Sequence, residues 1–140
     1  MLDIFKKSQV IDKNVQKETL IKITSLLIHA AKIDDNYSEK EKLIIINFLK
    51  TLDMEIDFDD VVKKAEDEEK NSNHILEFTQ EIKKNTMDFR KKIIKTLWEI
   101  ILSDDKSDMY ESTLMRRIAG LLYVPDKLIG ETKLEVLNKK

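Results

Sequence analysis

An internal repeat constrains the fold of this chain more than any other feature of its sequence. The pattern around residues 23–52 returns around residues 93–122 without a gap, at a constant offset of 70 that carries Asp34 onto Asp104. Two related helix pairs of this kind pack naturally about a pseudo-twofold axis and share one core. The matched positions are Ile23 with Ile93, Leu27 with Leu97, Ala30 with Ile100, Ala31 with Ile101, Asp34 and Asp35 with Asp104 and Asp105, Glu41 with Glu111, Ile44 with Leu114, Ile45 with Met115, Phe48 with Ile118, and Leu52 with Leu122.

The composition leaves helices as the material for both halves. The chain has only two glycines and one proline, which is too few for β-hairpin turns or glycine-rich phosphate loops. An apolar share of 41% argues against disorder, and 140 residues is the size of one ordinary domain. The sequence therefore predicts a single all-α domain over residues 1–140, a compact bundle of about seven helices with two pseudo-twofold-related pairs.

Apolar residues at helical spacing locate these helices. Pro125 suits the start of the last one, because proline is well placed in a first turn. Residues 1–12 are expected to be a short N-terminal extension, which docks on the bundle or acts as a weak membrane or partner contact. The predicted helices cover about residues 15–33, 39–52, 59–69, 75–82, 89–102, 108–122, and a last one from 125 onward.

Charge and cysteine content exclude several classes of function. A formal net charge of −2 without a basic stripe argues against nucleic acid binding. The absence of cysteine removes thiol catalysis, thiolate zinc sites and disulfides, and fits a cytoplasmic protein. No apolar run reaches the roughly 20 residues of a membrane span, so membrane association would be at most peripheral. Catalytic motifs are missing too, and we expect no enzyme; a small hydrolase with paired carboxylates would need an apolar cleft.

Two acidic helix-loop-helix corners are the candidate sites, and they allow two interpretations. In the first, Ser38-x-x-Glu41 is a capping box and Asp108-x-x-Glu111 a close variant, so the acidic residues only begin helices. In the second, the same acidic residues form a metal site, because a tight corner can bring two carboxylates close together.

In this second interpretation each corner binds a divalent cation. The ligands would be Asp34 with Glu41 and Asp104 with Glu111, because carboxylate oxygens suit Ca²⁺ or Mg²⁺ with water completing the shell. A standard twelve-residue calcium loop is excluded in both halves. Its glycine and final glutamate positions hold Glu39 and Ile45 in the first half, and Met109 and Met115 in the second.

Each half resembles the TerB-like family, named for tellurite resistance: an apolar helix, an Asp-Gly pair, a short polar loop, then glutamate in the next helix. The first copy runs from Ile28 to Glu41, and the second from Leu97 to Glu111. Asp35 and Asp105 stand where the family usually has glycine. The resemblance, over about residues 15–138, implies a compact all-helical fold and acidic residues suggested to bind metal. It also implies a link to tellurite or stress response through a protein partner, since tellurite capture by thiols needs cysteine.

Three further features have ordinary structural interpretations. His29 is expected to be partly buried and hydrogen-bonded, although it is near enough to Asp34 to approach the first corner. Trp98 is expected in the core. The acidic stretch at residues 66–69 reads as a solvated helix face, with a docking patch for a basic partner as its alternative.

Deleting residues 1–7 should leave the helical core folded, because seven residues bury too little to decide the stability of a domain this size. The truncated chain should keep a single cooperative thermal transition by circular dichroism. Loss of that transition would place Leu2, Ile4 and Phe5 in the core instead.

Overall fold

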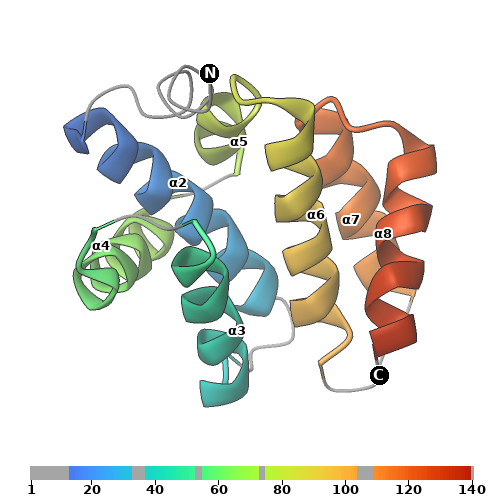
Figure 1. Ribbon diagram of the computed structural model, residues 1–140, viewed down its shortest axis with the longest axis horizontal. Helices are drawn as coiled ribbons and strands as arrows, with labels where there is room; N and C mark the ends of the chain where they lie inside the picture. Colours follow the sequence, from blue (N-terminus) through green and yellow to red (C-terminus); the bar gives the residue numbers. More distant parts are fainter. Residues whose placement is uncertain (1–12, 33–36, 53–54, 73–74, 104–108, 140) are drawn as a thin grey trace.

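The computed structural model describes residues 13–32, 37–52, 55–72, 75–103 and 109–139, with the side chains of 13–16, 109–112 and 139 left aside. These residues form helices and no strands, which confirms the all-α fold class and the seven-helix count (Figure 1). Residues 1–12, the predicted extension, lie outside the description. The helices are α2 (Lys13–Ala31), α3 (Glu39–Lys50), α4 (Phe58–Asn71), α5 (Leu76–Ile82), α6 (Met87–Ile101), α7 (Met109–Leu121) and α8 (Asp126–Lys139).

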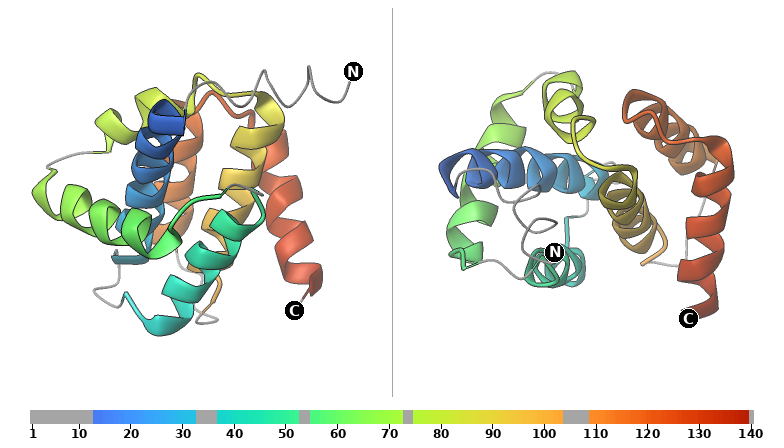
Figure 2. Two further views of the ribbon diagram at one scale, coloured as in Figure 1. Left: turned by 60° about the vertical axis from the view of Figure 1, so that its left-hand side comes forward. Right: turned by 45° about the horizontal axis from the view of Figure 1, so that its top comes forward.

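Helix α6 joins the two halves of the molecule. It packs against α2 and α3 on one side and against α7 and α8 on the other. Figure 1 shows α2, α3, α4 and α5 gathered to one side of α6, with α7 and α8 on the other. Helix α4 lies across the outer side of α2, as both views of Figure 2 show. One core runs through both halves, because α2 and α6 each bury a long apolar face.

The helix boundaries repeat at the offset found in the sequence. Helix α2 ends at Ala31 and α6 at Ile101, while α3 begins at Glu39 and α7 at Met109. The correspondence extends to a third helix, since α4 follows α3 and packs on α2 as α8 follows α7 and packs on α6. Superposition by a near-twofold rotation stays a prediction. Pairs buried in both halves are Ile23 and Ile93, Leu27 and Leu97, Ala30 and Ile100, Ala31 and Ile101, Ile45 and Met115, and Phe48 and Ile118.

Trp98 lies in the core, as the sequence predicts. Only 3% of the residue is exposed, and its indole N–H donates to the carbonyl of Ile129 on α8 at 3.1 Å. The Lys133 ammonium sits 5.1 Å from the ring centroid. A buried indole needs a partner for its one donor, so this bond fixes where α8 rests on α6.

Helix α7 ends in a Schellman motif with an unusual residue at its left-handed position. The Val124 N–H donates to Ala119 and the Tyr123 N–H to Gly120, which is the paired pattern of this cap. Tyr123 has φ of 57°, a conformation that usually belongs to glycine. The Arg90 guanidinium closes the same end by donating to the carbonyls of Leu122 at 2.7 Å and Tyr123 at 3.3 Å.

Replacing Tyr123 with glycine should stabilise the protein by about 0.5–1 kcal/mol, because a side chain in the left-handed region costs roughly 1–2 kcal/mol while glycine adds unfolded-state entropy. Urea unfolding measures the change. Tyr123→Ala is the matched control: it keeps the Cβ atom and loses only the exposed ring beside Lys83. An equal gain from alanine would attribute the effect to the ring rather than to φ.

Candidate functional site

The first acidic corner opens helix α3 with a complete capping box. The Ser38 hydroxyl accepts from the Glu41 backbone N–H at 3.3 Å, and Glu41 Oε1 accepts from the Ser38 N–H at 2.8 Å. The Ser38 hydroxyl also donates to the same carboxylate oxygen at 3.1 Å. The capping box predicted at the first corner is thus confirmed, while the interpretation that the acidic residues serve only as caps stays a prediction. Asp108, its counterpart in the second corner, lies outside the described residues.

Glu41 is the predicted metal ligand whose side chain the structure places. It is half-buried in the first turn of α3. Asp34 and Asp104 lie outside the described residues, and Glu111 belongs to α7 without its side chain being described. Within the described part of the chain, no group of three His, Cys, Asp or Glu residues could hold a metal ion. The four-residue ligand set therefore stays a prediction.

The chemistry of Glu41 allows both interpretations. Its capping bonds use Oε1, and an ionised carboxylate has about four acceptor sites over its two oxygens. Oε2 therefore keeps acceptor capacity that a hard cation such as Ca²⁺ or Mg²⁺ can use. A capping box and a cation contact are compatible at this one side chain.

A lysine links the chain segments that flank the two corners. The Lys40 Nζ, in the first turn of α3, donates to the carbonyl of Ser103 at 2.6 Å. Ser103 directly precedes Asp104, and α3 also packs on α6. The start of α3, which follows the first corner, therefore lies beside Ser103, which precedes the second, and the linear sequence does not reveal this proximity.

Glu69 of α4 anchors the C-terminal turn of α2, which leads into the first corner. Its Oε1 lies 2.8 Å from Lys32 Nζ, and its Oε2 lies 3.3 Å from His29 Nδ1. The Glu69 side chain is only 11% exposed, so water screens these contacts poorly. The expectation for His29 is confirmed: it is partly buried and bonded within the protein.

Glu66, one helical turn earlier on α4, holds the segment that leaves the corner. The Tyr37 hydroxyl donates to Glu66 Oε2 at 3.1 Å, and Lys42 Nζ of α3 lies 3.6 Å from the same oxygen. Burial, reinforced by the Glu66 charge, raises the pKa of Tyr37, so the phenol stays protonated and remains a donor. Glu66 and Glu69 thus contact residues on both sides of the segment 33–36.

The prediction of a solvated acidic face at residues 66–69 is wrong for Glu69, whose side chain is only 11% exposed, and for Glu66, which is half-buried. Glu66 and Glu69 are bound as described, and Glu68 lies 3.1 Å from Lys22 of α2. Asp67 is exposed. The reason is charge complementarity: α2 presents lysines and His29 along the side that α4 covers. That basic side of α2 was the available sequence signal for Glu69, whereas nothing in the sequence marked the contacts of Glu66 with Tyr37 and Lys42.

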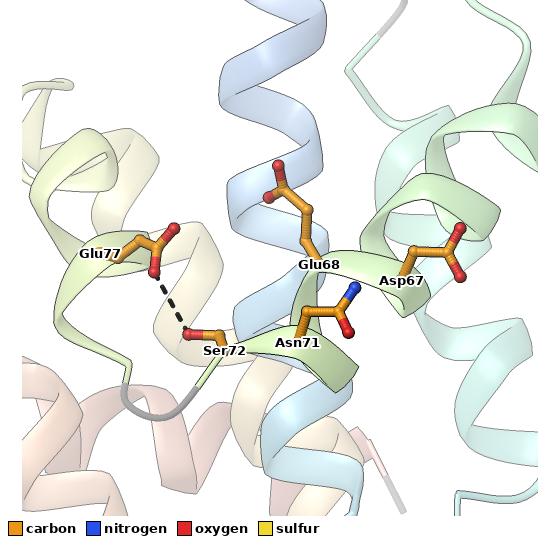
Figure 3. A pocket seen from close by; sticks show the side chains of 5 residues that line it. All are labelled: Asp67, Glu68, Asn71, Ser72 and Glu77. Atoms are coloured by element: carbon orange, nitrogen blue, oxygen red, sulfur yellow. Dashed lines mark hydrogen bonds between the residues drawn. The ribbon is translucent and has the colours of Figure 1, made fainter.

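An open pocket of about 210 Å³ lies where α4 meets α5, lined by Asp67, Glu68, Asn71, Ser72 and Glu77 (Figure 3). Its two glutamates are tied together, since Lys22 Nζ lies 3.1 Å from Glu68 and 3.4 Å from Glu77. The Ser72 hydroxyl donates to Glu77 at 3.3 Å. The lining is polar and lacks the apolar wall that a substrate cleft would have.

Comparison with known proteins assigns the chain to a family. A family model described as "Tellurite resistance protein TerB" matches residues 20–134, which is most of the chain. No curated protein and no solved structure matches significantly. Among the described helices, none has the length and apolar character needed to cross a membrane.

Glu69→Ala should cost about 1–3 kcal/mol of unfolding free energy, because it removes charge-assisted bonds from a poorly hydrated carboxylate. Glu68→Ala is the matched control on the same helix: its side chain is 41% exposed, so loss of its ion pair with Lys22 should cost at most about 1 kcal/mol. Both changes have the same helix propensity term, so chemical denaturation compares the contacts directly. Equal costs would mean that the Glu69 contacts are as weak as surface ion pairs.

Proposed function

This chain belongs to the TerB family, and on that premise we propose that it is a non-enzymatic binding module whose two acidic corners bind a divalent cation. Asp34 and Glu41 would provide the protein ligands in the first corner, and Asp104 and Glu111 those in the second. Ca²⁺ and Mg²⁺ are the cations that such oxygen ligands select. The bound cation would define a surface for a protein partner in a cytoplasmic tellurite or stress response.

The observation that carries this proposal is the repeated spacing of the acidic residues between matching helix ends. In both halves the same length of chain, residues 32–38 and 102–108, joins helices that end and begin at equivalent positions. Each aspartate and each glutamate therefore occupies the same place relative to the helix ends. A capping box requires the glutamate but has no use for the aspartate, whereas a cation site uses both.

Electrostatics favours a cation at this end of the bundle. Residues 34–41 hold four carboxylates and one lysine, and residues 104–111 hold four carboxylates and one lysine. Like charges at short range repel and raise the cost of ionisation, and a bound divalent cation removes that cost. Of the two lysines within these segments, the structure describes Lys40, whose ammonium donates to the Ser103 carbonyl.

A metal-free interaction or scaffold domain is the second candidate function, and the formed capping box favours it. Ser38 and Glu41 satisfy each other's backbone donors without any cation. In that case the acidic end of the bundle would face a basic partner directly.

A role in tellurite response would run through partners rather than through direct chemistry. Tellurite reduction or capture by protein thiols needs cysteine, and this chain has none. The proposed link is therefore a cation-dependent contact with another protein that carries the chemistry.

Glu41→Gln separates the two functions, because glutamine can complete a capping box but is a poor ligand for a hard cation. A cation at 100-fold its Kd stabilises the folded state by about 2.7 kcal/mol. That stabilisation should raise the melting temperature by several degrees, at roughly 2–8 °C per kcal/mol. Glu41→Gln, Asp34→Asn and Asp104→Asn should each reduce this rise, measured with Ca²⁺, with Mg²⁺ and with chelator.

Asp67→Asn is the control, since it removes an exposed carboxylate from α4 and leaves both corners intact. It should keep the full response to the cation. Overlapping wild-type melting curves with millimolar metal and with chelator would exclude a useful cation site and leave the metal-free domain.

A further inference from the structure

We propose that the exposed face of helix α7 is a docking surface that binds a carboxylate-rich segment of a partner protein. Four residues form this surface, which we call the α7 face: Arg116, Arg117, Gly120 and Tyr123. The α7 face includes none of the predicted cation ligands. It therefore goes beyond the proposed function and stands whether or not the acidic corners bind a metal.

Helical spacing brings these four residues to one side of α7. Arg116 lies four residues before Gly120 and Arg117 three, which is the spacing of neighbours on a helix surface, and all three are exposed. Tyr123 follows at the cap of the same helix, where 66% of the residue is exposed. The other side of α7 faces the core, with the buried residues Leu114, Met115, Ile118 and Ala119.

Tyr123 is a poor choice for folding alone. Its φ of 57° favours glycine, because a Cβ atom in the left-handed region costs backbone energy. The ring gains little in return: it is largely exposed, and the Lys83 ammonium lies 5.3 Å from its centroid, a contact that is weak at an exposed site. A residue that strains the backbone and exposes a large ring is typical of a site where function sets the choice.

Gly120 leaves bare backbone between the arginines and the Tyr123 ring. A Cβ atom at this position would meet nothing within 4 Å, so packing does not require glycine, and glycine stabilises a helix less than alanine does. Gly130 of α8 has the same freedom, which shows that an exposed glycine alone marks no site. The neighbours of Gly120 make the difference, because an apolar side chain of a partner can approach the backbone there and lie against the ring.

The charges of the α7 face select an acidic partner. Arg116 and Arg117 are exposed and form no ion pair in the part of the chain that the structure describes. Lys83 adds a third cation beside the Tyr123 ring. A guanidinium group binds a carboxylate through two parallel hydrogen bonds, and tyrosine and arginine are the residue types that contribute most to binding at protein interfaces.

Membranes and nucleic acids fit the α7 face less well than a protein segment does. Lipid-binding basic clusters contain roughly four to eight lysines or arginines, more than the three cations gathered here. Nucleic acid binding also calls for a basic domain, whereas this chain has a net charge of −2. Bare backbone beside a ring recognises the shape of a side chain, which a lipid headgroup or a phosphate backbone does not provide.

NMR titration of the isotope-labelled full chain with a short acetylated peptide of glutamate and leucine tests the surface. Millimolar peptide should cause saturable shifts of the amides at residues 116–123 and leave those of α4 in place. The same peptide with glutamine for glutamate should cause none, because the carboxylates are what the arginines bind. Added salt should weaken the binding, since exposed charges are screened.

Substitutions of the two arginines separate the site from net charge. Arg116→Gln with Arg117→Gln should weaken the peptide by roughly ten-fold or more, as expected for residues at the centre of an interface. Lys63→Gln with Lys70→Gln is the matched control, because it removes the same charge from two exposed positions of α4. The control should keep the affinity within about two-fold, as screening of distant charges implies.

The two residues that are unfavourable for folding provide a second test. Tyr123→Gly and Gly120→Ala should each raise the melting temperature while weakening the peptide, so stability and binding change in opposite directions. Gly130→Ala should give a similar gain in stability without any loss of binding, because it adds the same methyl group to an open position of α8.

Absence of saturable shifts at residues 116–123 would overturn the proposal, and so would equal losses of affinity in the arginine variant and its α4 control. Full peptide affinity in both Tyr123→Gly and Gly120→Ala would show that ring and bare backbone take no part. Binding to vesicles containing phosphatidylserine, without binding to the peptide, would assign the α7 face to membranes. Shifts of the same amides with protein concentration alone would assign it to a second copy of the chain.

Discussion

The burial of α2 is the constraint on which the rest of this structure depends. From Leu20 to Ala31 nearly every residue of α2 is inside the protein, whichever face it occupies. A helix that is apolar almost all round must be covered on several sides at once. Helices α3, α4, α5 and α6 provide that cover, so their places follow from the need to keep water away from one element. Thr24 shows the strength of the constraint: its hydroxyl is buried without a hydrogen-bond partner in the described part of the chain, at a cost of about 1–3 kcal/mol.

Two kinds of cover meet on α2. Helix α6 covers it with large apolar side chains, among them Ile93, Leu97 and Ile101, all buried. Helix α4 covers it with two valines and an alanine, and relies on carboxylates paired with the lysines of α2. Apolar contact of the first kind is insensitive to salt, whereas ion pairs near the surface weaken as salt rises. The interface of α2 with α6 should therefore be insensitive to salt, whereas the interface of α2 with α4 should weaken as salt rises.

The two halves of the repeat differ in the contacts that hold the helix after each corner. Both retain the acidic residues of the corner and the helix boundaries around it. In the first half, Glu66 and Glu69 of α4 contact residues on both sides of the corner. In the second half, the Trp98 indole donates to the Ile129 carbonyl on α8, and Val136 of α8 is buried. Ion pairs contribute to the packing of α4 on α2, whereas α8 packs on α6 through the Trp98 bond, apolar burial and the Glu135 ion pairs.

By itself, the sequence determined the helix content, the repeat and the first capping box. Periodic apolar residues locate helices, and Ser38 to Glu41 is a local motif whose partners are three residues apart, so no tertiary information is needed. Only the tertiary structure decided what the charged residues do. The sequence alone predicts that Glu69 is solvated, because its partners His29 and Lys32 are about 40 residues away in the chain. The nearness of Lys40 to Ser103 was equally hidden, at a separation of 63. Local patterns are written in the sequence because their partners are near in the chain, whereas ion pairs depend on how helices are stacked, and that is set by the burial of α2.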